Sequence, residues 1–182
     1  MSGIKGLVIL SRYDYIDNKF GKDTLDLFYQ KLNAEDKDHF HQPVIISNEY
    51  PEILLKEIDE LLLSDYFKND VSKFYEVGQY NARTLLPRYF QIYIDSKNAS
   101  QFLQQMSRVR DILIGLGEMT VVQMDAKTHL ARINYGQPYI ESVRLSEMAF
   151  LDEGCSMCGA KNVRISLEDK TDISVEYQIV WD

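Results

Sequence analysis

The chain has 182 residues, a formal net charge of −8 and 45% apolar residues. This length fits one domain with a core that needs no disulfide or metal to stabilise it. The average content of apolar and charged residues excludes a disordered or fibrous chain, and the acidic balance disfavours binding to a nucleic-acid backbone.

The N-terminal segment and the cysteine content indicate the compartment. The apolar run Leu7–Leu10 is followed by Arg12 and Asp14, so it lacks the h-region of about 7–15 residues that a signal peptide requires. No stretch approaches the run of about 20 apolar residues that spans a bilayer. Two cysteines are too few for a secreted disulfide framework. We therefore predict a cytoplasmic protein without a membrane span.

Residues 4–116 show the apolar spacing of helices. Gly21 separates the first two segments, and Pro51 is suited to the first position of a later helix. Leu86-Pro87 is expected to interrupt the following helix, and a segment from about Asn98 should end at Gly115 or Gly117. The apolar residues that carry the spacing are Leu7, Leu10, Tyr13, Leu25, Phe28, Tyr29, Leu32, Leu54, Ile58, Leu61, Leu62, Phe74, Val77, Tyr80, Phe102, Met106, Val109 and Leu113.

After Gly117 the period changes to two. Met119–Met124 and Leu130–Tyr135 predict a hairpin, and residues 139–158 predict a helix that ends before Gly159. Alternation in residues 163–168 and 173–181 predicts two further strands. The order β-β-α-β-β indicates an antiparallel four-stranded sheet with one covered face. We predict a single α+β domain over residues 1–182, with a helical part at 1–116 and a sheet part at 117–182.

Cys155 and Cys158 form a CxxC motif, for which redox and metal-binding functions are the alternatives to packing. A redox motif lowers its thiol pKa at a helix N-terminus, whereas these cysteines lie near a predicted C-terminus. A zinc site needs four ligands, and the sequence offers no second pair to complete one. We therefore predict that both cysteines pack in the core, with no metal site.

The remaining polar residues do not form a catalytic set. His39 and His41 lie in a polar stretch typical of a solvated loop, and His129 is expected at the surface or edge of a strand. No Ser/His/Asp set, Walker loop or GxGxxG motif is present, so we predict no catalytic residue and no enzymatic activity. A solvated helix face is expected for Glu57, Asp59 and Glu60, and dispersed salt bridges for Arg83, Arg88, Arg108 and Arg110.

Several short motifs, in order, resemble the haem nitric oxide/oxygen-binding (H-NOX) domain. Lys5–Val8 and Lys19–Thr24 are similar to its opening helix and Lys-Phe-Gly turn. The later motifs are Tyr50-Pro51, Phe74–Tyr80, Phe102–Met106 and Tyr177–Trp181. The resemblance covers nearly the whole chain and implies a helical part packed on an antiparallel sheet. It is closest to a haem-free bacterial group, in a superfamily that also contains 4-vinyl reductase domains and TRAPP subunits.

The resemblance also implies that the haem chemistry has been lost. H-NOX domains bind iron through a histidine, and the matching segment here leads to Arg110, whose guanidinium has no lone pair to donate. Their Tyr-x-Ser-x-Arg propionate clamp becomes Tyr135–Tyr139, which keeps the tyrosine but loses the serine and the arginine. We regard the later S-x-R spacing of Ser142 and Arg144 as accidental, and we predict no haem or other cofactor.

The leading hypothesis is therefore a non-catalytic signalling or adaptor domain that binds a protein partner. The alternative is a sensor that binds a small hydrophobic or anionic ligand in the former haem pocket, with Arg110, Tyr135, Gln137 and Tyr139 as ligand-binding residues. A haem-based gas sensor with another iron ligand and a redox protein using the CxxC motif rank lower. Association through helical faces, common in the superfamily, leaves a homodimer open.

Overall fold

The computed structural model describes residues 3–32 and 43–182. The chain divides into two compact units. The first comprises Met1–Lys73 with Leu113–Gly115, and the second comprises Phe74–Ile112 with Leu116–Asp182. The helices and the four-stranded antiparallel sheet confirm the predicted α+β class. No helix in the described part of the chain is long and apolar enough to cross a membrane.

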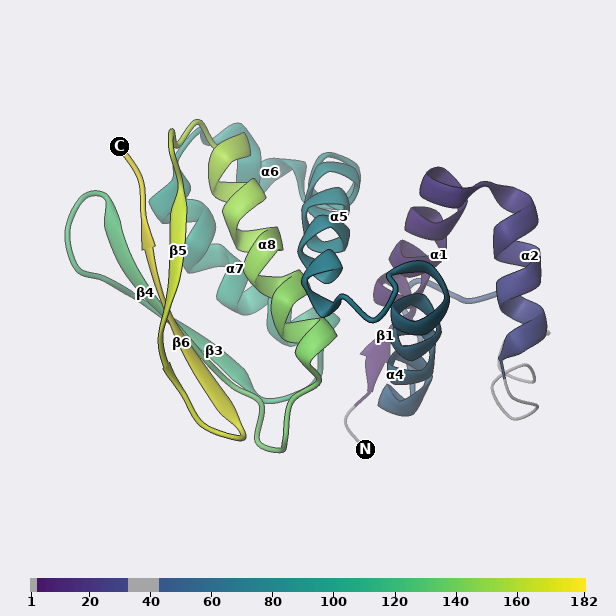
Figure 1. The fold of residues 1–182 in the computed structure, drawn as a ribbon. Helices are drawn as coiled ribbons and strands as arrows, with labels where there is room; N and C mark the ends of the chain where they lie inside the picture. The colour runs from purple at the N-terminus through teal and green to yellow at the C-terminus, as the bar shows by residue number, and fades with distance from the viewer. Residues whose placement is uncertain (1–2, 33–42) are drawn as a thin grey trace. The chain divides into compact units, whose positions relative to one another are not determined.

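The first unit consists mainly of helices (Figure 1). Gly21 separates α1 from α2 as predicted, and its φ of 90° lies in the left-handed region that favours glycine. The core of the first unit is formed by aromatic and aliphatic residues that include Tyr15, Phe28 and Ile58. The elements of this unit are β1 (Ile4–Lys5), α1 (Gly6–Phe20), α2 (Lys22–Lys31), β2 (Glu49–Tyr50), α4 (Glu52–Leu61), a π-helical turn (Leu62–Tyr66) and a 3-10 turn (Val71–Lys73).

Three expectations for this unit are wrong. Ile4–Lys5 form a strand paired with Glu49–Tyr50 instead of continuing the helical pattern, because so short a segment carries no readable period. Asp59 lies 2% exposed instead of on a solvated face. Its oxygens accept hydrogen bonds from Arg12 Nε at 2.8 Å and Nη2 at 3.4 Å, so a cation on another helix neutralises the buried carboxylate. Pro51 immediately precedes α4 instead of occupying its first position.

The second unit packs helices against one face of a sheet, and Figure 1 shows α7 and α8 on the same side of the strands. The sheet order is β3-β4-β6-β5, with all neighbours antiparallel. This arrangement confirms the predicted β-β-α-β-β order. The elements are α5 (Phe74–Tyr89), α6 (Gln91–Asp95), α7 (Ala99–Leu113), β3 (Glu118–Gln123), β4 (Thr128–Asn134), α8 (Glu141–Met157), β5 (Arg164–Lys170) and β6 (Ser174–Val180).

Alternation places one face of the central strands in the core. Ala131 and Ile133 of β4 are buried, and Ile133 pairs with the buried Val175 of β6. Gly159 follows α8 with a φ of 92°, as expected for a residue just past a helix end. The second unit therefore has a core between the sheet and its helices, as the helical spacing and the period-two alternation in the sequence predict.

The expected interruption at Pro87 is also wrong, because α5 continues through it to Tyr89. Pro87 gives up the hydrogen bond that another residue would donate one turn back, but its ring is exposed and α5 ends only two residues later. The short helix α6 follows and was not predicted. Its five residues are too few to display a helical period.

Candidate functional site

Arg110, the residue that replaces the expected iron ligand, lies buried near the C-terminal end of α7. Its side chain is 5% exposed. Nε donates to Glu147 Oε1 on α8 at 2.8 Å, and Nη1 donates to the Leu116 carbonyl at 2.9 Å. Glu147 is itself only 11% exposed. The charge of Arg110 is therefore compensated inside the second unit, as a buried ion requires.

Tyr135, the residue that follows β4, completes this arrangement. Its hydroxyl donates to Glu147 Oε2 at 2.7 Å, and its ring centroid lies 5.2 Å from Arg110 Cζ. The ring of Tyr139 lies 5.2 Å from that of Tyr135. Burial, together with the nearby Glu147 charge, raises the pKa of Tyr135 well above its ordinary value of 10.0. The hydroxyl therefore stays protonated at neutral pH and acts as a donor.

The guanidinium of Arg110 is not fully satisfied. Nη2 is enclosed but has no hydrogen-bond partner among residues 3–32 and 43–182. A buried donor without an acceptor costs about 1–3 kcal/mol. This nitrogen is therefore the part of the site that can form a new hydrogen bond.

The structure brings together three of the four residues predicted to bind a ligand, namely Arg110, Tyr135 and Tyr139. Gln137 lies partly exposed in the loop between β4 and α8. Sequence reasoning missed Glu147, which joins two of them. No sequence signal singles it out, because a buried arginine requires a carboxylate but α8 alone carries four, at Glu141, Glu147, Asp152 and Glu153.

The nearby Arg144, set aside as accidental, is a structural residue. It pairs with Glu141 through Nε and Nη2, and its Nη1 donates to the Tyr177 hydroxyl at 3.0 Å. Burial raises the pKa of Tyr177 to about 12. Of the other arginines, Arg83 forms the expected dispersed salt bridge with Glu153.

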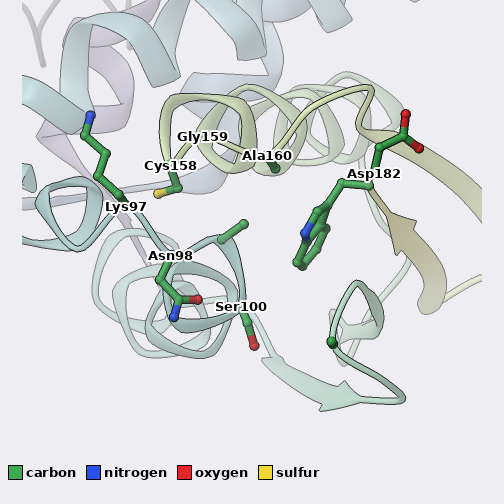
Figure 2. Close-up of a pocket in the computed structure, with 10 residues that line it drawn as sticks. Lys97, Asn98, Ser100, Cys158, Gly159, Ala160 and Asp182 are labelled. Carbon is green, nitrogen blue, oxygen red and sulfur yellow. The ribbon is translucent and has the colours of Figure 1, made fainter.

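A concave region lies at the start of α7, about ten residues from Arg110 along the same helix. It is a pocket of about 220 Å³, and Figure 2 shows side chains from the α7 start, the end of α8 and the C-terminal strand around it. None of the predicted ligand-binding residues lines it. The lining residues are Lys97, Asn98, Ala99, Ser100, Ala126, Cys158, Gly159, Ala160, Trp181 and Asp182.

His129 lies behind this pocket and corrects the expectation of a surface residue. It is 0% exposed, its Nε2 is 2.8 Å from Ser100 Oγ, and its ring stacks on Trp181 with centroids 5.0 Å apart. The strand pattern could not reveal this burial because the covering ring comes from the end of the chain. Burial lowers the pKa of His129 below its ordinary value of 6.5, although Asp125 opposes the shift.

This shift predicts a pH dependence of stability. Because the pKa of His129 is lower in the folded state, the unfolded chain binds the proton more readily below 6.5. Stability should therefore fall as pH decreases through 6.5, by at most about 1.4 kcal/mol per pH unit. Urea unfolding at a series of pH values measures this slope. A His129→Phe variant, which keeps a ring against Trp181, should show a shallower slope, and an equal slope would contradict the assignment.

Both cysteines are buried, as the packing prediction expects, at 0% exposure for Cys155 and 2% for Cys158. Burial raises the pKa of Cys158 to about 11 and raises that of Cys155 also. Neither thiol is therefore activated as a nucleophile at neutral pH. Within the described residues, no group of three or more metal-ligating side chains occurs. The solvated-loop prediction for His39 and His41 falls outside those residues.

Comparison with solved structures shows the fold. The chain is similar to an H-NOX protein from K. algicida in the unliganded Fe(II) form, with a TM-score of 0.75 at 11% identity, covering 98% of this chain and 97% of that chain. It is also similar to an oxygen-binding H-NOX domain related to soluble guanylate cyclases, with a TM-score of 0.77 at 12% identity, covering 98% and 95%. An H-NOX structure from work on haem distortion gives 0.79 at 12% identity, with the same coverage. No protein-family model and no curated protein matches the chain.

The chain therefore has an H-NOX-like fold, as the ordered motifs predict. The fold family implies haem, and a haem site requires a residue that can bind iron at the expected ligand position. Arg110 does not fit, because its guanidinium is always protonated, has no lone pair for iron, and is held by Glu147 and the Leu116 carbonyl. His129 is the one histidine among the described residues, and it is hydrogen-bonded to Ser100 and stacked on Trp181.

Proposed function

We propose that this chain is a non-catalytic signalling domain that uses an H-NOX-like fold without haem and acts through a protein partner. The observation that carries the proposal is the buried ion pair between Arg110 and Glu147 at the expected iron-ligand position. This ion pair supports a scaffold role because the side chain at the expected iron-ligand position is bound to a carboxylate of the protein. The buried, unactivated cysteines and the lack of a metal cluster among the described residues give no support to the redox alternative.

Haem reconstitution tests the first part of this proposal. Purified protein incubated with haem and passed through a desalting column should show no Soret band, because Arg110 offers no lone pair. Arg110→His is the matched variant, since it supplies an imidazole at the same position. A Soret band with stoichiometric haem in the unmodified protein would contradict the proposal and would favour a gas sensor with another iron ligand.

Affinity capture tests the second part. The full chain, tagged at either end in separate experiments, should retain the same protein from extracts of its source under several conditions. Purified components should then form a complex of defined stoichiometry by light scattering. Failure to obtain a reproducible partner that binds in purified form would count against the signalling role.

A second candidate function is supported by a separate observation. The unpartnered Nη2 of Arg110 is a buried donor that a small molecule could satisfy. This favours a sensor that binds its ligand at Arg110, with the rings of Tyr135 and Tyr139 nearby. Co-purified small molecules released by denaturation and identified by mass spectrometry would test it.

A further inference from the structure

The two edge strands of the sheet differ in how well they are protected from further pairing. In the order β3-β4-β6-β5, the outer sides of β3 and β5 pair with no strand among residues 3–32 and 43–182. Proteins commonly protect such edges with charges, prolines or bulges. β5 has a register shift between Leu167 and Asp169 and the charged run Glu168-Asp169-Lys170. β3 has an unbroken register with β4, and residues 119–124 contain no charge or proline.

The register of β3 determines which backbone groups face this open side. The Met124 N–H donates to the Thr128 carbonyl at 2.9 Å, where the hairpin turns from β3 to β4. Hydrogen-bonded and non-hydrogen-bonded pairs alternate along an antiparallel ladder. Even-numbered residues of β3 therefore direct their N–H and C=O groups toward β4, and odd-numbered residues direct theirs away from it. The outward groups belong to Met119, Val121 and Gln123.

Solvent reaches this edge of the sheet. Thr120 and Gln123 are exposed, Val122 is 55% exposed, and Met124 continues the apolar surface at 59%. An exposed, uncharged edge strand with outward backbone groups is a template for one more strand. The partner that fits β3 is therefore an extended segment that supplies N–H and C=O groups in register.

A second copy of β3 supplies these groups when a two-fold axis passes through Val121. Such an axis makes the two strands antiparallel. Val121 then lies opposite Val121 of the second copy, and Met119 lies opposite Gln123 of the second copy. All three outward residues of each copy thus fall in hydrogen-bonded pairs, so the edge is complementary to itself.

The side chains are compatible with the same register. Thr120 lies opposite Val122 of the second copy, which pairs two β-branched residues on the exposed face. Glu118 lies opposite Met124 of the second copy, so no two like charges are placed face to face. This matters because each copy carries a net charge of −8, and copies with this charge repel each other over most of their surface.

We propose that the outer edge of β3 is a homodimer interface, at which two copies join antiparallel into one continuous sheet. The homodimer that the sequence leaves open is thereby assigned to a sheet edge instead of a helical face. A pair of six-residue strands buries less surface than the roughly 1,200–2,000 Å² of a stable interface. The dimer should therefore be reversible, with a Kd above about 1 μM.

Two substitutions test the interface and leave the β3–β4 ladder intact. Val122→Lys places two lysines diagonally across the axis, and it should raise the Kd at least about tenfold. Val121→Pro removes an outward N–H, at a position where edge strands accept proline, and it should abolish the dimer. Leu167→Lys is the matched control, because it makes the same charge change at a 39% exposed residue of β5. It should alter the Kd by less than about twofold.

Sedimentation equilibrium of the full chain measures the association, at an ionic strength of about 0.15 M and at concentrations up to about 1 mM. Amide hydrogen exchange then locates the interface. As the concentration rises, protection should increase at Met119, Val121 and Gln123. It should change little at Thr120 and Val122, whose N–H groups face β4 in the monomer.

Three results would each overturn the proposal: a chain that stays monomeric over the whole series, equal weakening by the two lysine substitutions, or protection that rises without alternating along β3. If the chain alone stays monomeric while a captured partner protects the odd-numbered residues, the occupant of the edge is that partner and not a second copy. Unfolding curves show which variants are folded, and Val122→Lys decides the question if Val121→Pro does not fold. Haem uptake, which tests the proposed function, does not depend on this interface.

Discussion

Replacing Glu147 by leucine is expected to destabilise the protein by about 3–5 kcal/mol, because it leaves the buried charge of Arg110 without a partner. The same change removes the acceptor of the Tyr135 hydroxyl, which is also buried. Urea unfolding at neutral pH, followed by circular dichroism, measures the loss as a shift of the midpoint at constant slope.

The matched variants identify the cause. In Arg110→Met/Glu147→Leu both charges are absent, so most of the lost stability should return, and the double-mutant cycle should give a coupling of several kcal/mol between the two positions. Glu153→Gln is the control on the same helix. Its partner Arg83 is 57% exposed, so the loss of this surface pair should cost no more than about 1 kcal/mol. A Glu147→Leu variant as stable as Glu153→Gln would show that Arg110 is not buried as described.

The sheet and its helix could be predicted because their signals are local. Period-two alternation in residues 119–124 and 130–135 and the helix before Gly159 depend on neighbours within a few positions. The bounds of β3, β4 and α8 in the structure lie within two residues of these expectations. The strands β1 and β2 and the helix α6 were missed because each is too short to show a period.

The polar interior was harder to predict, because it depends on partners far apart in sequence. Asp59 is buried because Arg12 lies opposite it, and His129 because Trp181 covers it. The sequence analysis predicted that Arg110, at the expected iron-ligand position, lies near two tyrosines. It did not predict the partner Glu147, which is 37 positions away along the chain. A single sequence shows that a buried arginine needs a counter-ion, but it does not identify the residue that provides one. The pairing of Arg110 Nε with Glu147 could therefore come only from the structure.

The last prediction concerns the packing that holds the site helix in place. Gly78 of α5 faces α8 so closely that an added Cβ would lie 2.1 Å from the Ser146 carbonyl oxygen and 2.8 Å from Ala149 Cβ. The first contact is with backbone, which cannot rotate away. Gly78→Ala should therefore destabilise the protein by about 3 kcal/mol, although alanine in an open helix position would be favourable by about 1 kcal/mol.

Because α8 carries Glu147, this substitution should also disturb the Arg110 site at a distance. Near-ultraviolet circular dichroism and the nuclear magnetic resonance signals of the Arg110 side chain should both change, whereas Gln104→Ala, at an exposed position on α7, should leave stability within about 0.5 kcal/mol. A Gly78→Ala protein more stable than the unmodified chain would mean that α5 and α8 are not in contact at this glycine. The geometry of the ion pair would then need another support, since α5 is the helix with which α8 makes its most extensive contact.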